Sequence, residues 1–156
     1  MDSSADASLS SDELRGLCDV AGTMIPADAT LGVPGADDPA ILDDIVTSIG
    51  RDLPMVRAAL AAIAGRADGG FAALDRARRE ALIGDWYASG GAAAGALGRV
   101  ILGAYYRDDR VLRSLGHEAG PPFPRGYTVE QGDWSLLETV RHRPKLWRDD
   151  REEQAK

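Results

Sequence analysis

The sequence contains very few of the residues that usually carry redox centres. Of 156 residues, only one is cysteine and two are histidine. A single cysteine cannot ligate an iron–sulfur cluster, and the Cys-Xaa-Xaa-Cys-His pattern that attaches a c-type haem is absent. Cys18 lies at a core spacing of a predicted helix, where a small buried thiol is more common than a nucleophile. We therefore expect no redox cofactor on this chain.

Catalytic and metal-binding patterns are also lacking. His117 and His142 are 25 residues apart, and neither has a carboxylate or cysteine at a zinc-ligand spacing. No Gly-Xaa-Gly-Xaa-Xaa-Gly follows a predicted strand, so no nucleotide loop is expected. Four Asp pairs are present, but adjacent side chains point apart and most of the pairs flank helices. The Asp pairs are at positions 37–38, 43–44, 108–109 and 149–150. We therefore predict no catalytic, cofactor-binding or metal-binding residue on this chain.

No segment has the features of a membrane span, an export signal or a nucleic-acid surface. The longest low-charge stretch, residues 92–106, is short, rich in glycine and interrupted by Arg99. Residues 1–11 are acidic and contain no twin arginine. The first 44 residues carry a net charge of −9, which would repel phosphate backbones. We expect the protein to be cytoplasmic as encoded, and periplasmic only if it is exported together with a partner. We expect it neither to bind nucleic acid nor to insert directly into a membrane.

The apolar residues that are present recur with helical period. Ser10 and Glu13 form a capping box ahead of a helix that Pro26 ends. Asp38 and Pro39 start a second helix, which ends at Gly50. Further helices are predicted at about 54–66, from Phe71 to about 89, at 93–106 and at 108–116. The loop at 26–38 is long for a compact domain. No sustained two-residue alternation is found, so we predict a single all-α domain of five or six helices, at 10–116.

The last forty residues differ in composition from this domain. Residues 117–148 are predicted to form an extended arm rich in proline and aromatic residues, and residues 149–156 a flexible charged tail. At the other end of the chain, residues 1–9 are predicted to be a flexible acidic N-terminus. Two of the three tryptophans lie in the arm, which is too short to form a core of its own. Aromatic side chains on such a segment indicate a partner-binding arm, while packing back onto its own helices is the open alternative. The predicted interface residues are Tyr105, Tyr106, Pro122, Phe123, Tyr127, Trp134, Leu137 and Trp147.

Several short motifs follow one another along the chain. The first helix runs into MIPAD at 24–28 and a glycine-rich loop, and AYYRDDRV at 104–111 leads to SLG at 114–116. PPFPRGY follows at 121–127, with Trp134 and Leu137 after it. In their order and spacing these motifs resemble the gluconate 2-dehydrogenase subunit 3 family, and the resemblance covers about residues 14–148. Many members begin with a twin-arginine signal, and this chain departs from them there.

The resemblance implies an accessory subunit. Such small subunits bind and stabilise a large FAD-dependent dehydrogenase of the glucose–methanol–choline type, often with a cytochrome c subunit, and have no assigned catalytic residues. FAD is then expected on the partner and no cofactor on this chain. One alternative is a stand-alone helical ligand-binding or regulatory protein whose glycine-rich middle forms a pocket. Another is a small lyase or hydrolase that uses His117 with Glu118 or an Asp pair.

Overall fold

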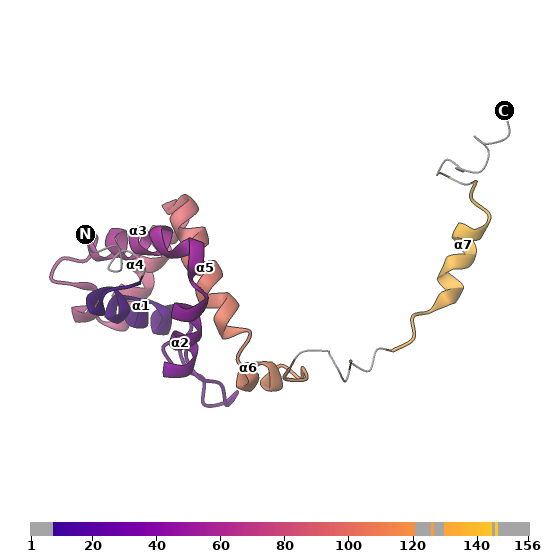
Figure 1. Ribbon diagram of the computed structural model, residues 1–156, viewed down its shortest axis with the longest axis horizontal. Coiled ribbons are helices and arrows are strands. Elements are labelled where there is room, and N and C mark those ends of the chain that lie inside the picture. Colours follow the sequence, from indigo (N-terminus) through magenta and orange to yellow (C-terminus); the bar gives the residue numbers. More distant parts are fainter. Residues whose placement is uncertain (1–7, 121–125, 127–129, 145, 147–156) are drawn as a thin grey trace. The chain divides into compact units, whose positions relative to one another are not determined.

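The computed structural model describes residues 8–120, 126, 130–144 and 146, and it divides the chain into two compact units, 1–120 and 121–156 (Figure 1). Regular structure in the described residues is helical, and the only pairing of extended backbone there is an isolated bridge between Asp28 and Val33. The predicted all-α fold is confirmed. Within the described residues, no helix is long and apolar enough to cross a membrane.

Helix α1 (Ser11–Met24) begins as the sequence predicts. The Ser10 hydroxyl accepts from the backbone N–H of Glu13 at 3.3 Å, and the Glu13 carboxylate accepts from the Ser10 N–H at 2.7 Å. The hydrogen bond from the Ser10 backbone N–H lowers the pKa of Glu13 most, and the Ser10 side chain and Arg57 lower it further. Glu13 also forms an ion pair with Arg57 at 3.1 Å. The capping box thus fixes both the start of α1 and a contact with α3 (Leu53–Ala64).

Helix α2 (Pro39–Ser48) is capped by Asp38, whose side chain accepts from the Ala40 N–H at 3.0 Å. Gly50, with a φ of 43°, ends the helix and begins the short 3₁₀ helix η1 (Gly50–Asp52), which leads into α3. A positive φ is tolerated by glycine at little cost, which explains why the second helix stops there. The predicted boundaries of both helices are confirmed within two residues.

The fourth helix begins later than the sequence pattern indicated. Phe71 lies in a separate 3₁₀ turn, η2 (Phe71–Ala73), and α4 (Arg76–Ser89) starts only after Asp75, which accepts from the Arg78 N–H at 2.9 Å. The expectation that Phe71 and Leu74 begin this helix is wrong. Asp75 offers a better N-cap than Gly70, the residue directly before Phe71. Phe71 is nevertheless buried, so it contributes to the core from outside the helix.

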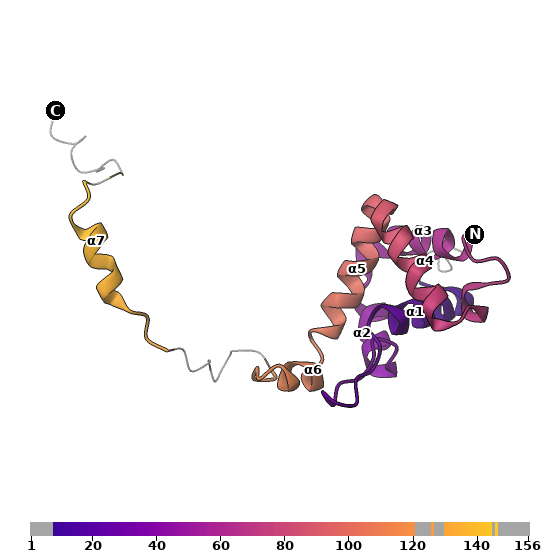
Figure 2. The same cartoon turned by 180° about the vertical axis from the view of Figure 1, so that it is seen from behind.

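Helix α5 (Gly91–Tyr105) is the central element of the first unit. It packs against α2, α3 and α4, and α1 packs against α3 and α4 (Figures 1 and 2). Helix α6 (Asp109–Ser114) follows, capped by Asp108. The core extends from Leu9 to Val111, and the largest fully buried side chains are Leu17, Val20, Ile41, Ile45, Val56, Ile63, Leu97, Ile101 and Val111.

The second unit contains two short helical elements, η3 (Trp134–Leu137) and α7 (Glu138–Arg141), which follow one another directly. The prediction of an extended arm is therefore wrong for residues 134–141. Asp133 caps this segment by accepting from the N–H of Ser135 at 3.0 Å and from its hydroxyl at 2.6 Å. Once that cap is in place, the run Trp134–Arg141 contains no proline or glycine to prevent helical turns.

Candidate partner-binding surfaces

The C-terminal helix segment, defined as residues 134–141, exposes large apolar side chains. Trp134 is 67% exposed and Leu136 71% exposed, and neither η3 nor α7 has a buried residue. Trp134, Leu137 and Val140 follow one another at intervals of three, which places them on one face of a helical segment. A row of exposed apolar side chains on one face is typical of a segment that docks on another surface.

Polar contacts at its two ends help to hold this segment in shape. The Trp134 indole N–H donates to the Gln131 Oε1 at 3.0 Å. The hydrogen bonds from Ser135 lower the pKa of Asp133, so the cap stays ionised at the positive end of the helix. At the other end Glu138 pairs with Arg141 at 2.6 Å. Because these contacts leave the apolar faces of Trp134 and Leu137 uncovered, they order the segment without burying it.

The other predicted interface residues differ in how exposed they are, and some lie outside the described residues. Tyr105 is only 6% exposed and belongs to the core, so it cannot contact a partner in this conformation. The prediction that Tyr105 is an interface residue is therefore wrong. Burial raises the pKa of its hydroxyl. Tyr106 is exposed and packs edge-on against Tyr105, with ring centroids 5.4 Å apart. The remaining predicted residues lie outside the described residues: Pro122, Phe123, Tyr127 and Trp147.

A second apolar surface was not predicted from the sequence. A groove of about 400 Å³ lies between the last turn of α1, one face of α4 and the exposed side of α5. Leu102 is 41% exposed on α5 and Tyr87 is similarly exposed on α4. We call this surface the apolar groove; its lining residues are Thr23, Met24, Glu80, Ile83, Gly84, Tyr87 and Leu102. The spacing of Glu80, Ile83, Gly84 and Tyr87 could have indicated one helix face, but not that Leu102 of α5 would join it.

A polar pocket of about 330 Å³ lies between α1 and the start of α4, where a ligand-binding protein could hold a small molecule. Two of its charged groups pair with each other. Arg79 pairs with Asp19 at 3.6 Å, donates to the Leu74 carbonyl at 3.0 Å and covers the Phe71 ring. Burial, with Asp37 and Asp19 nearby, raises the pKa of the Cys18 thiol, which disfavours the nucleophilic thiolate. The pocket is not formed by the glycine-rich middle of the chain.

The glycines of that middle segment are helix breakers and close-packing sites. Gly69, Gly70 and Gly91 have positive φ values of 82°, 96° and 56°. At Gly98, a Cβ atom would lie only 2.1 Å from the Tyr87 hydroxyl, so the absence of a side chain lets α4 and α5 approach closely. These glycines therefore shape the helix packing beside the apolar groove.

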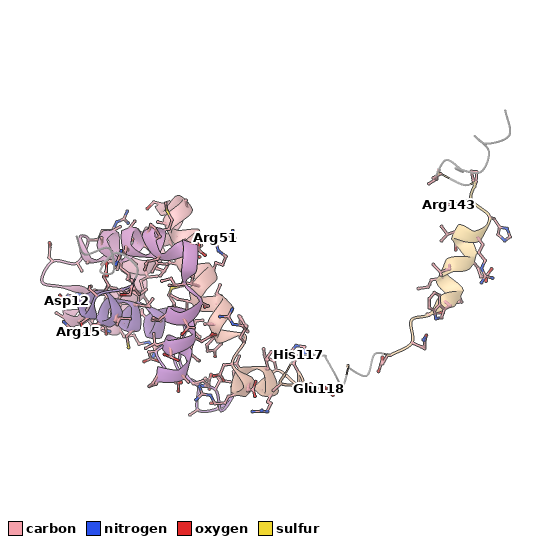
Figure 3. The ribbon with its side chains drawn as sticks, in the orientation of Figure 1. Asp12, Arg15, Arg51, His117, Glu118 and Arg143 are labelled. Atoms are coloured by element: carbon pink, nitrogen blue, oxygen red, sulfur yellow. The ribbon has the colours of Figure 1, made fainter. Side chains whose placement is uncertain are left out.

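The histidines lie apart from any catalytic arrangement of described residues. His117 and Glu118 lie just beyond the end of α6, and both are exposed (Figure 3). No hydrogen bond or ion pair joins their side chains to a described residue. His142 is exposed at the end of α7. In the described part of the chain, no group of three or more His, Cys, Asp and Glu side chains could hold a metal ion.

The chain has no match among protein-family models, curated proteins or solved structures. The resemblance to the gluconate 2-dehydrogenase subunit 3 family therefore depends on the sequence motifs alone.

Proposed function

We propose that this chain is a non-catalytic small subunit that binds and stabilises a large FAD-dependent dehydrogenase of the glucose–methanol–choline type. The substrate of that dehydrogenase would be a sugar, a glycoside or an alcohol. The observation that carries the proposal is the exposed apolar face of the C-terminal helix segment. A helix that exposes Trp134, Leu137 and Val140 gains free energy by docking in an apolar groove of a partner. FAD would belong to the partner, and a cytochrome c subunit could join the complex.

Two further observations support a binding role. The motifs that resemble the small-subunit family include Tyr106, which is exposed, and Trp134 and Leu137, which lie in the C-terminal helix segment. Aromatic side chains dominate the binding energy of many protein interfaces because they bury a large area with few rotatable bonds. Trp134 is also held in place by Gln131, which lowers the entropy lost on binding.

The proposal is tested by co-expression with an FAD-dependent dehydrogenase of the glucose–methanol–choline type from the same genome. Size-exclusion chromatography should show the two chains eluting together with flavin absorbance. Trp134→Ala should weaken the complex by about 2 kcal/mol or more, roughly a thirtyfold higher Kd. Leu31→Ala is the matched control, because Leu31 is an exposed leucine in the loop before α2 and is not part of the C-terminal helix segment. Separate elution of the two wild-type chains would reject the proposal.

A further inference from the structure

The hydrogen bond between Trp134 and Gln131 joins the largest exposed side chain of the C-terminal helix segment to a residue that precedes the segment. The Trp134 indole N–H donates to the Gln131 Oε1 at 3.0 Å, although Trp134 is 67% exposed. At an exposed position water satisfies the same donor, so the bond adds little to the stability of the free chain. It becomes important only where water is excluded from the indole.

Burial of the indole in a partner would exclude that water. An indole has one hydrogen-bond donor and no acceptor. If Trp134 left water for an apolar pocket without a partner for this donor, binding would be weaker by roughly tenfold or more. Gln131 belongs to the same chain and already holds the donor, so the ring can enter a pocket that contains no acceptor of its own.

The face around the indole makes no other side-chain demand for a hydrogen bond. Trp134, Leu137 and Val140 share this face, and the last two have purely aliphatic side chains. The neighbouring Ser135 is also satisfied, because both its N–H and its hydroxyl donate to the Asp133 carboxylate. The face thus presents apolar surface with its one side-chain donor already paired, which suits an apolar receiving surface.

We propose that Gln131 keeps the indole hydrogen bond of Trp134 in the complex, and that the flavoprotein pocket which receives the ring is apolar and supplies no acceptor. Gln131 is then a positioning residue, because it acts on the partner only through Trp134. The inference rests on the proposed function, since it describes the flavoprotein surface on which the C-terminal helix segment docks. It adds the chemistry of that surface and a residue that sets the affinity for it.

A double-mutant cycle on the full-length chain tests the inference, with the Kd for the flavoprotein measured by calorimetry. Gln131→Met keeps the length of the side chain but removes the acceptor, and it should raise the Kd about tenfold. Trp134→Phe keeps an aromatic ring but removes the donor. In the Trp134→Phe background, Gln131→Met should change the Kd less than about twofold, because no donor remains to be satisfied. Glu130→Met, at the exposed neighbouring position, is the control and should also change the Kd less than about twofold.

Nuclear magnetic resonance of the free full-length chain gives a readout that needs no partner. Gln131→Met should shift the indole N–H signal of Trp134, which Trp134→Phe identifies by removing it, and an unchanged signal would overturn the inference. Separate elution of the wild-type chain and the flavoprotein rejects the proposed function and this inference with it. A complex in which Gln131→Met has the same effect in both backgrounds, or no more effect than Glu130→Met, leaves the proposed function intact and overturns the inference alone.

Discussion

Arg110 joins the beginnings of two helices with one guanidinium group. It contacts the carboxylate of Asp38, the N-cap of α2, at 2.9 Å and 3.0 Å, and that of Asp108, the N-cap of α6, at 2.8 Å. The hydrogen bonds from Arg110 lower the pKa of both carboxyl groups. Paired carboxylates of this kind also keep each cap ionised at the positive end of its helix.

This arrangement predicts how stability depends on pH. A carboxyl group with a lowered pKa stabilises the fold above its ordinary pKa, 3.8 for Asp, and loses that contribution as the pH falls through the folded-state pKa. Arg110→Gln should therefore lower the melting temperature at pH 6, and the difference from wild type should shrink below about pH 4. Arg113→Gln, which removes only an exposed pair with Asp109, should have a smaller effect. A difference of equal size at pH 6 and pH 3 would contradict the linkage.

The histidines supply a second prediction at the residue scale. Because His117 and His142 are exposed and their side chains have no hydrogen-bonding or ionic partner among the described residues, replacing both by Gln should leave the activity of the reconstituted dehydrogenase complex within a few fold. A loss of about a hundredfold, which corresponds to roughly 2.7 kcal/mol of activation free energy, would assign one of them a role in the reaction. The measurement is the steady-state rate with the flavoprotein's substrate.

Single residues show where sequence reasoning succeeds and where it stops. Ser10, Asp38 and Asp108 were identifiable as caps because a cap acts on backbone N–H groups two or three residues away. Tyr105 and Tyr106 are neighbours with the same chemistry, and only the packing of α5 decides that the first is buried and the second exposed. The ion pair between Arg110 and Asp38 joins residues 72 positions apart, which no local pattern encodes.

At the scale of the element, the capping box of α1 allows a direct test. Ser10→Ala removes the acceptor for the Glu13 N–H and should destabilise the protein by about 1 kcal/mol. For a unit of this size, that lowers the melting temperature by roughly 3 to 6 °C. Ser11→Ala is a close control, because the neighbouring hydroxyl has no hydrogen bond to a described residue and alanine is a good helix former. Equal melting temperatures for the two variants would mean that the Ser10 hydroxyl contributes nothing to stability.

The elements that were predicted incorrectly have a common cause. Phe71 and Leu74 fit the helical period of α4, yet they precede it, because Asp75 starts the helix and Arg79 bonds to the turn before it. The C-terminal segment was predicted to be extended because prolines are frequent around it, but none lies between Trp134 and Arg141. The apolar groove is assembled from α1, α4 and α5 together, so the period of any one helix cannot reveal it.

At the scale of the whole molecule, the core and the exposed apolar surfaces lie in different parts of the sequence. All buried hydrophobic side chains of the described residues fall between Leu9 and Val111. The described residues after Gly120 contribute none, although they include Trp134 and Leu137. The first unit thus contains the buried apolar core, and the large apolar side chains described in the second unit are exposed.

Truncation after Gly120 tests whether the first unit is stable without the second. Because none of the described residues after Gly120 belongs to the core, the shortened chain should stay helical and melt within about 2 °C of the full-length protein, a shift well below that expected for the loss of 1 kcal/mol. It should also fail to bind the flavoprotein. Circular dichroism gives the melting temperature, and co-elution reports binding. A fall of about 8 °C or more would mean that the arm packs on its own helices, the alternative that composition left open, because only lost core contacts could destabilise a unit whose own residues are unchanged.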